Sequence, residues 1–256
     1  MRHNFNIKKM EDGKTMLNLG CGYRTHWGWN NLDLSLYARL AHYKILGRLL
    51  KKAGFLSEER YQRLAGIDPG IIVWNLRKGI PFPDGVFDVV YHSHLLEHID
   101  RDSALPFLKE CHRVLKAGGI IRVVVPDLKI LVDRYNSAFL QSEDGDKKAL
   151  AEHQRAISDI FDQMVRRQLT GAPGQSNFLL IIERLLRGDT TKSGSSHRWM
   201  YDRHSLETVL TDAEFKDIRK ADACESRISG WRHFNLDHND NDTAYKPESI
   251  YMEGVK

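Results

Sequence analysis

A short apolar segment that stops at two glycines is the feature that most constrains this chain. The run Met16–Leu19 is followed directly by Gly20-Cys21-Gly22. This pattern predicts a buried strand that ends in a tight turn, because glycine permits a positive φ and a close approach to the backbone. A second run, Trp29–Leu34, contains Asp33, which follows Gly20 by thirteen residues.

This pair of features indicates a nucleoside site. In an open α/β sheet, a glycine turn after one strand faces the ligand, and a carboxylate after the next strand accepts the ribose hydroxyls. A dinucleotide site would have a third glycine, as in G-x-G-x-x-G, and Thr25 stands at that position. The segment therefore favours a nucleoside without a pyrophosphate. A plain strand and turn that bind no ligand are the alternative.

Further apolar runs along the chain are typical of buried strands. Helical patterns over Ser103–Leu115 and Asp202–Ala213 alternate with these runs. The runs are Ile71–Leu76, Val86–Tyr91, Ile120–Val125, Phe215–Lys220 and Ser249–Val255. Strands that are apolar throughout and that alternate with helices predict an α/β fold with a doubly wound, mostly parallel seven-stranded sheet.

Two segments interrupt the alternation and define the predicted domains. Residues 15–127 and 197–256 are expected to form one Rossmann-like domain, preceded by a flexible N-terminus over residues 1–14. Residues 35–70 are expected to add a basic helical insertion. Residues 128–196 contain no strand pattern, and we expect them to form a helical lid over the carboxyl edge of the sheet.

The net charge of +4 has one local source. Between Leu36 and Gly66, seven Lys or Arg residues stand against two Glu residues, which gives a charge of +5. The apolar spacing from Leu36 to Ala53 predicts an amphipathic helix. We expect this helix to pack on the sheet with a solvated basic face. Peripheral contact with an anionic membrane, or with an anionic substrate, is the alternative.

The remaining composition favours a cytoplasmic protein. No apolar run is long enough to cross a bilayer, and no secretory signal precedes the first strand. Cys21, Cys111 and Cys224 are far apart and show neither disulfide nor metal-site spacing. A reducing compartment is therefore the expected location.

Four motifs in order resemble the class I S-adenosylmethionine-dependent methyltransferases. They are the Leu17–Gly22 turn, Asp33, Phe87–Val90 with Leu95–His98, and Arg113–Gly119. The likeness covers residues 15–127, with a looser match over residues 197–256. It is closest to the branch that acts in small-molecule and surface-glycan biosynthesis.

The resemblance implies S-adenosylmethionine as cofactor and assigns residues to it. Two departures from the family pattern stand out: Asn75 replaces an acid, and only about ten residues separate Gly22 from Asp33, too few for the usual full helix. The implied contacts are the backbone of Leu19, Gly20, Cys21 and Gly22 for the amino-acid part, Asp33 for the ribose, Asn75 and Leu76 for the adenine, and Ser93 beside the sulfur.

The implied activity is methyl transfer to a small-molecule, glycan-linked or lipid-linked acceptor, at an oxygen atom. The sulfonium is already a good leaving group, so the rate depends on alignment of the acceptor and exclusion of water. A hydroxyl acceptor also needs a base. The candidates at the carboxyl edge are His94, His98, Asp127 and His197.

The same residues leave other functions open. The segment His94–His98 fits the H-x-x-E-H pattern of zinc proteases, although it follows a buried strand instead of lying within a helix. Glu97 and His98 also resemble positions at which some quinone-biosynthesis methyltransferases hold a divalent cation, so transfer could be metal-assisted. We assign no metal ligand from the sequence.

Two further alternatives concern nucleic acid and a loss of catalysis. A basic chain suggests an RNA methyltransferase, but the excess charge lies in one segment and no base-flipping motif follows the fourth strand. Nucleic acid is therefore disfavoured as a partner. A homologue that binds the cofactor without catalysis is the remaining alternative.

Overall fold

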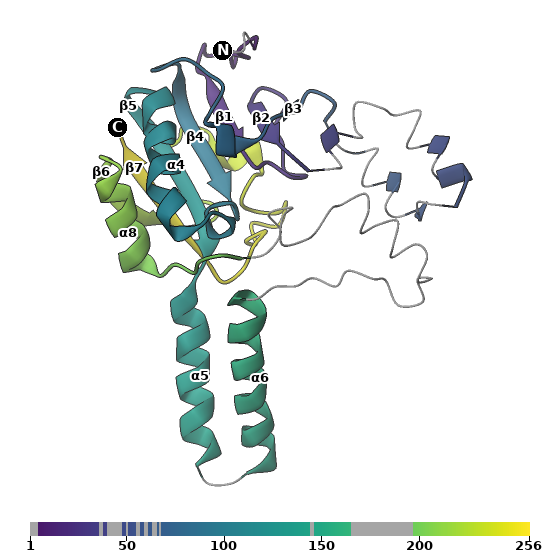
Figure 1. Ribbon diagram of the computed structural model, residues 1–256, viewed down its shortest axis with the longest axis vertical. Coiled ribbons are helices and arrows are strands. Elements are labelled where there is room, and N and C mark those ends of the chain that lie inside the picture. Colours follow the sequence, from purple (N-terminus) through teal and green to yellow (C-terminus); the bar gives the residue numbers. More distant parts are fainter. Residues whose placement is uncertain are drawn as a thin grey trace.

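The structure is a computed structural model, and its strands form one sheet. It describes residues 5–35, 38–39, 48–49, 51–54, 57–58, 61–62, 66, 68–143, 146–164 and 197–256. The helix predicted over residues 36–53 lies largely outside these residues, and residues 165–196 of the predicted lid lie outside them entirely. The described strands follow the order β3-β2-β1-β4-β5-β7-β6 (Figure 1).

The sheet is mostly parallel, as the sequence predicts. Its strands are β1 (Met16–Leu19), β2 (Asn30–Asp33), β3 (Ile72–Val73), β4 (Phe87–Ser93), β5 (Leu115–Pro126), β6 (Lys216–Ala221) and β7 (Ser249–Val255). Strands β3, β2, β1, β4 and β5 pair in parallel, whereas β7 pairs antiparallel with both β5 and β6. Strand β3 is shorter than expected because Asn75 caps a 3-10 turn, η1 (Leu76–Lys78).

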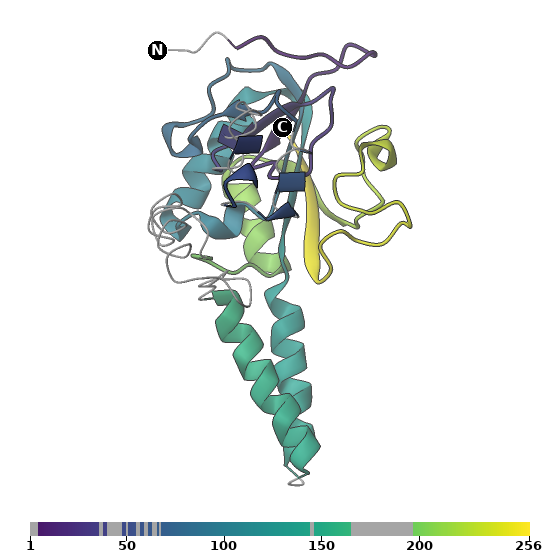
Figure 2. The same cartoon turned by 90° about the vertical axis from the view of Figure 1, so that its right-hand side faces the viewer.

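The two faces of the sheet are covered in different ways (Figure 2). Helices α4 (Arg101–Val114) and α8 (Arg203–Asp212) lie on one face, over the larger apolar core. Residues 222–247, which include the 3-10 helix η3 (Trp231–Phe234), lie on the other. There a second core contains Trp29, Tyr91 and aromatic residues of η3. Among the described residues, α-helices therefore cover only one face of the sheet, whereas the predicted double winding has them on both.

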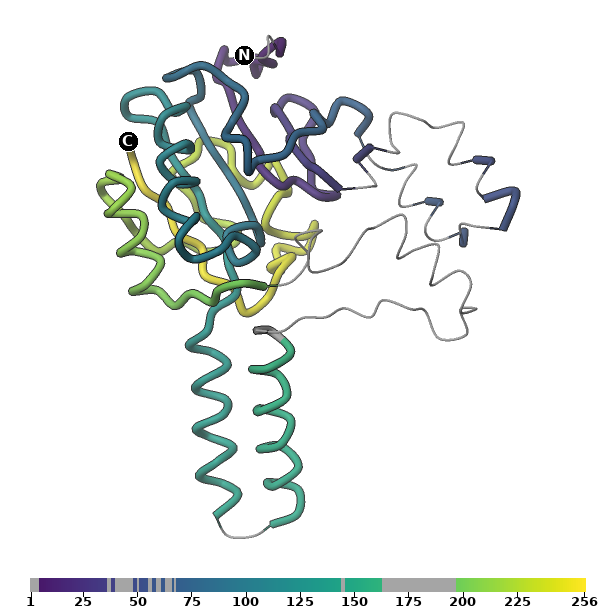
Figure 3. The backbone as a smooth tube through the Cα atoms, viewed as in Figure 1, coloured from purple at the N-terminus to yellow at the C-terminus, as the bar shows by residue number. Residues whose placement is uncertain are grey.

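The described part of the predicted lid forms a helical pair. Helices α5 (Leu128–Ser142) and α6 (Lys147–Met164) lie side by side and extend away from the sheet (Figures 1 and 3). Arg134 of α5 pairs with Asp159 of α6 at 3.3 Å. A lid over the strand ends is therefore not confirmed by the described residues. No helix in the described ranges is long and apolar enough to cross a membrane.

The N-terminal residues pack on the domain from Phe5 onward. The Phe5 ring lies 6.1 Å from the Trp74 ring and 5.9 Å from the Phe82 ring, between centroids. The Lys8 N–H donates to Asn30 Oδ1 at 2.9 Å. Part of the N-terminal stretch thus contacts the domain, and the flexibility expected for residues 1–14 stays a prediction.

A buried charge network joins the sheet to the segment over residues 222–247. Arg122 of β5 is fully buried, and its guanidinium lies 2.8 Å from Asp237 Oδ2 and 2.8 Å from Glu253 Oε1. Tyr91 donates to Asp237 Oδ1 at 2.5 Å, and the Trp231 ring lies 4.4 Å from the Arg122 guanidinium carbon. Burial of paired charges is tolerated because each carboxylate has a cationic partner.

Replacement of Arg122 should therefore destabilise the protein strongly. Arg122→Met keeps the side-chain volume but leaves the buried Asp237 without its cation and Glu253 with only the half-exposed Arg219, so we expect a loss of about 3–5 kcal/mol of unfolding free energy. Arg219→Met is the matched control, because Arg219 also contacts Glu253, at 3.2 Å, but is half-exposed. It should cost less than about 1 kcal/mol in chemical denaturation. Equal losses in the two variants would contradict this role.

His92 should make stability depend on pH. Burial lowers the pKa of this β4 side chain to about 4, and its ring packs edge-to-face on Phe107 at 5.4 Å. The unfolded chain, with a histidine pKa of about 6.5, binds the proton first, so the unfolding free energy should fall as the pH drops from 6.5 toward 4. The unfolding free energy of His92→Leu should fall less over this pH range. Denaturation at several pH values measures this, and an equal dependence on pH in the variant and the wild type would refute the assignment.

Candidate functional site

The turn after β1 has the geometry of a ligand cradle. Gly20 and Gly22 both have positive φ angles, of +64° and +52°. A Cβ on Gly20 would lie 2.9 Å from Leu95 Cδ1, whereas a Cβ on Gly22 would meet no atom within 4 Å. Gly20 is therefore packed against the chain, and Gly22 borders open space through which a ligand can approach the backbone.

Asp33 lies beside this turn, as the sequence predicts. The Gly22 N–H donates to Asp33 Oδ2 at 2.9 Å, and the Ser35 N–H donates to Oδ1 at 2.5 Å. Each carboxylate oxygen keeps a further lone pair for a ligand hydroxyl. Burial raises the pKa of the intervening Cys21 thiol, so this group stays protonated and is a poor nucleophile. The turn from Leu19 to Gly22 and Asp33 thus form one site.

Asn75 and Leu76 follow β3 and lie next to this site along the sheet. The Trp74 N–H donates to the Asp33 carbonyl at 3.1 Å, which ties the end of β3 to the end of β2. Asn75 Oδ1 already accepts the Arg77 N–H at 3.0 Å. Leu76 is half-buried against the larger core. Their contact with an adenine ring stays a prediction.

The end of β4 lies on the other side of β1. Leu19 pairs with His92, so the parallel register places Gly20 next to Ser93. His94 follows with a positive φ of +51°, a strained value for a residue with a side chain. Its Nδ1 lies 3.1 Å from Glu97 Oε1, and its Nε2 lies 3.0 Å from Ser249 Oγ.

Glu97 is a fully buried acid in the 3-10 turn η2 (Leu96–His98). Burial opposes its ionisation, but the contact with His94 and the nearby His98 outweigh burial and lower the pKa of Glu97. The carboxylate is therefore charged at neutral pH and acts as a hydrogen-bond acceptor. The sequence draws attention to Glu97 only through the H-x-x-E-H and cation-site patterns.

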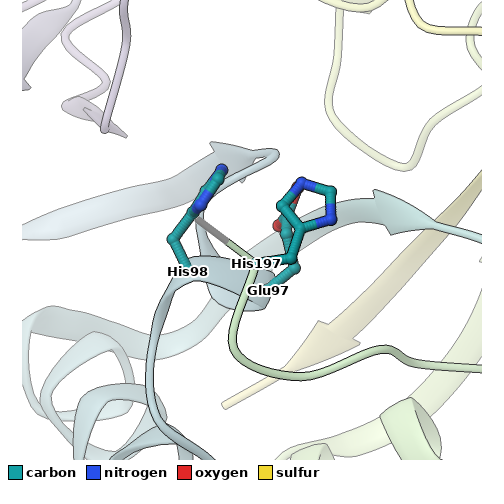
Figure 4. A group of neighbouring side chains, drawn as sticks. All are labelled: Glu97, His98 and His197. Atoms are coloured by element: carbon teal, nitrogen blue, oxygen red, sulfur yellow. The ribbon is translucent and has the colours of Figure 1, made fainter. Parts of the chain in front are cut away.

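His98 and His197 are brought together across 99 positions of sequence. Their ring centroids are 4.8 Å apart, and His197 Nε2 lies 4.0 Å from Glu97 Oε1 (Figure 4). The backbone explains this approach, because the Arg198 and Trp199 N–H groups both donate to the Glu97 carbonyl, at 2.7 and 3.2 Å. The segment that contains Arg198 and Trp199 is thereby held against η2.

The ligand atoms of this cluster lie farther apart than those around a bound zinc ion. Glu97, His98 and His197 offer ligand atoms within 4.8 Å of one another. Ligands about 2.1 Å from one tetrahedral ion would be roughly 3.4 Å apart, closer than the 4.0 Å between His197 and Glu97. The zinc-protease interpretation is wrong, because His94 is not helical and does not share a helix face with His98.

Asp127, the remaining candidate base, has a structural role. It caps α5 by accepting the Lys129 N–H at 2.9 Å, and its backbone pairs with Tyr201. An acidic side chain at the first turn of a helix also interacts favourably with the helix dipole. The position after β5, which suggested a base, is thus explained by the start of the helix.

Arg24 is a site residue that the sequence gives no means of finding. It follows the glycine turn and donates to the Asn235 carbonyl at 3.1 Å and to Asn239 Oδ1 at 2.6 Å. Its guanidinium lies 3.7 Å from the centre of the Tyr245 ring. A hollow of about 500 Å³ lies here, lined by Tyr23, Gln62, Gly66 and Tyr245. Arg24 thus fastens the segment over residues 222–247 to the turn.

A larger hollow lies elsewhere on the sheet. It measures about 620 Å³ and is lined by residues between Arg219 and His233, at the β6 edge. Strands β4, β5 and β7 separate it from β1 in the sheet order. The glycine turn and Asp33 are therefore not part of it.

Arg24→Ala should loosen the segment that it holds. We expect faster amide hydrogen exchange over residues 235–245, because two hydrogen bonds and the stacking on Tyr245 are lost. Arg232→Ala is the control, since Arg232 is exposed and makes only a 3.3 Å ion pair with Asp242 in the same segment. Exchange that rises equally in both variants would argue against a specific fastening role.

Comparisons with known proteins find similarity to methyltransferases over a short part of the chain in sequence and over most of it in structure. The protein "Probable methyltransferase ltbC" from Aspergillus luteorubrus is 40% identical over 57 residues, which is 21% of this chain and 20% of that protein. A SAM-dependent methyltransferase structure from Archaeoglobus fulgidus has 14% identity over 95% of this chain and 86% of its own, with a TM-score of 0.39.

The structure of a SAM-dependent methyltransferase from Thermotoga maritima, described as a possible histamine N-methyltransferase, has 13% identity. The match covers 94% of this chain and 82% of that chain, with a TM-score of 0.40. Scores this low establish no common fold by themselves. The stronger finding is a family model, described as a methyltransferase domain, that matches residues 17–123. This range contains the glycine turn, Asp33 and the end of β4. Residues 17–123, which hold these features, thus match a methyltransferase domain.

Proposed function

We propose that the whole chain is an S-adenosylmethionine-dependent methyltransferase that methylates an oxygen atom of a small-molecule, glycan-linked or lipid-linked acceptor. The observation that supports it most is the hydrogen bond from the Gly22 N–H to the Asp33 carboxylate, 2.9 Å long, beside open space over Gly22. This contact unites two strand ends in the arrangement that suits a nucleoside. The family match over residues 17–123 supports the same conclusion.

The residues of the site fit the cofactor by their chemistry. Asp33 offers charged acceptors to two ribose hydroxyls, and the glycine turn offers backbone without side chains to the amino-acid part. Ser93 ends β4 and His94 follows it, and we infer that the transferable methyl lies beside these two residues. Bound S-adenosylmethionine supplies an activated methyl group, and the protein has to align the acceptor with it and exclude water.

The acceptor class is inferred from the groups near the end of β4. A hydroxyl acceptor needs a base, and His94 is half-buried with a ring nitrogen directed at a hydroxyl group. The basic segment over residues 35–70, which lies mostly outside the described residues, would suit an anionic acceptor or a membrane surface that presents one. We propose that this segment sets the choice of acceptor.

Loss of the Asp33 carboxylate should weaken cofactor binding. For Asp33→Ala we expect the affinity for S-adenosylhomocysteine to fall by about 1–3 kcal/mol, or roughly 5- to 150-fold, because the ribose hydroxyls lose a charged acceptor. Isothermal titration calorimetry measures this change. Asp33→Asn tests the charge while it keeps an oxygen for one of the two backbone N–H groups.

A matched control is Asp133→Ala, which removes an exposed acid on α5, and it should bind like the wild type. Wild-type affinity in the Asp33 variants would show that the ribose does not bind at this carboxylate. Failure of the wild-type protein to bind either S-adenosylmethionine or S-adenosylhomocysteine would reject the proposed function itself.

A further inference from the structure

Two side chains of one turn, Glu97 and His94, lie in a row with Ser249 of β7 at the end of β4. Glu97 Oε1 lies 3.1 Å from His94 Nδ1, and His94 Nε2 lies 3.0 Å from Ser249 Oγ. Glu97 is fully buried, whereas one fifth of the His94 side chain is exposed. The chain of contacts therefore runs from the interior toward the surface.

The buried carboxylate determines which nitrogen of His94 carries the proton. An ionised carboxylate can only accept hydrogen bonds, so Nδ1 must donate to Glu97. In a neutral ring, Nε2 is then left as the acceptor, and it is the nitrogen that faces the Ser249 hydroxyl. A buried acid that fixes a histidine tautomer is the arrangement by which an imidazole becomes an oriented general base.

The backbone holds the ring in this orientation at a cost. His94 has a φ of +51°, a region that residues with side chains occupy rarely. Its N–H donates to the Val124 carbonyl at 2.9 Å, which fixes the turn against β5. Glu97 is fixed in turn, because its carbonyl accepts two N–H groups of the chain that follows His197. Such strain is common where a side chain has to point at a reacting group.

We propose that His94 is the general base for an acceptor hydroxyl, that Glu97 is its positioning residue, and that Ser249 marks the place where that hydroxyl binds. This inference rests on the proposed function and narrows it to O-methylation at the β4 end. The acceptor O–H gives its proton to His94 Nε2. Its oxygen then bonds to the methyl carbon as the sulfur–methyl bond breaks, which leaves a methyl ether and S-adenosylhomocysteine.

His98 and His197 are less suited to this role. His197 is buried, with only 7% of its surface exposed, and its Nε2 lies 4.0 Å from the Glu97 oxygen that His94 approaches to 3.1 Å. His98 packs its ring against His197. Figure 4 shows His197 beside Glu97, with His98 next to both.

The tautomer of His94 tests the inference without a known acceptor. Full-length protein labelled with ¹⁵N-histidine and saturated with S-adenosylhomocysteine would be studied by long-range ¹H–¹⁵N correlation NMR. We expect neutral His94 with its proton on Nδ1. Glu97→Gln should move the proton to Nε2, because the amide can donate to Nδ1. Glu207→Gln, an exposed change on α8, should leave the spectrum of His94 unchanged.

A wild-type His94 that carries its proton on Nε2 alone would overturn the inference, even if Glu97→Gln failed to fold. So would a Glu97→Gln spectrum in which His94 is unchanged. Binding of S-adenosylhomocysteine, measured in the same samples, separates this outcome from a failure of the proposed function.

A turnover measurement then tests the acceptor atom. With tritium-labelled S-adenosylmethionine and a panel of phenols, sugar alcohols, amines and thiols, we expect label only in the hydroxyl compounds. Glu97→Gln should lower kcat by about 10²- to 10⁴-fold, the usual contribution of a general base, with little change in the KM for S-adenosylmethionine. Transfer to amines or thiols alone, or to no compound in the panel, would contradict the proposal.

Discussion

The parallel pairing of β2, β1 and β4 is the constraint on which the site depends. Because the three strands run in the same direction, their carboxyl ends meet at one edge of the sheet. The register of Leu19 with both Leu32 and His92 places the glycine turn between Asp33 and Ser93. A shift of one residue in either pairing would separate these groups and turn every side chain to the opposite face.

The buried ion pairs of Arg122 hold residues 222–247 on the second face, which no α-helix of the described ranges covers. The short connection between β1 and β2 leaves no room for one there, and the segment over residues 222–247 lies on this face instead. Asp237 holds this segment on the sheet, because its carboxylate accepts hydrogen bonds from both Arg122 and Tyr91. Arg24 then joins the same segment to the glycine turn, so the integrity of this face and the shape of the site are coupled.

Local patterns predict the strands, the mostly parallel sheet and the placement of the glycine turn and Asp33 after neighbouring strands, because apolar runs and glycine turns act over short distances. Arg122 and Glu253 each interrupt an apolar run, in β5 and β7, and a charged residue in such a run indicates a buried ion pair. Contacts that join distant segments, such as His94 with Ser249, leave no such pattern. The sequence also does not predict the direction of α5, because the same amphipathic pattern fits a lid over the sheet and a helical pair that projects from it.

The central claim is that the edge formed by β2, β1 and β4 binds the methyl donor with its sulfur toward His94. A crystal structure with S-adenosylhomocysteine tests it most directly. We predict the amino-acid part against the Gly20–Gly22 backbone, both ribose hydroxyls on Asp33, and the sulfur on the side of Ser93 and His94. A ligand bound elsewhere, or bound with its sulfur directed away from the end of β4, would contradict the account.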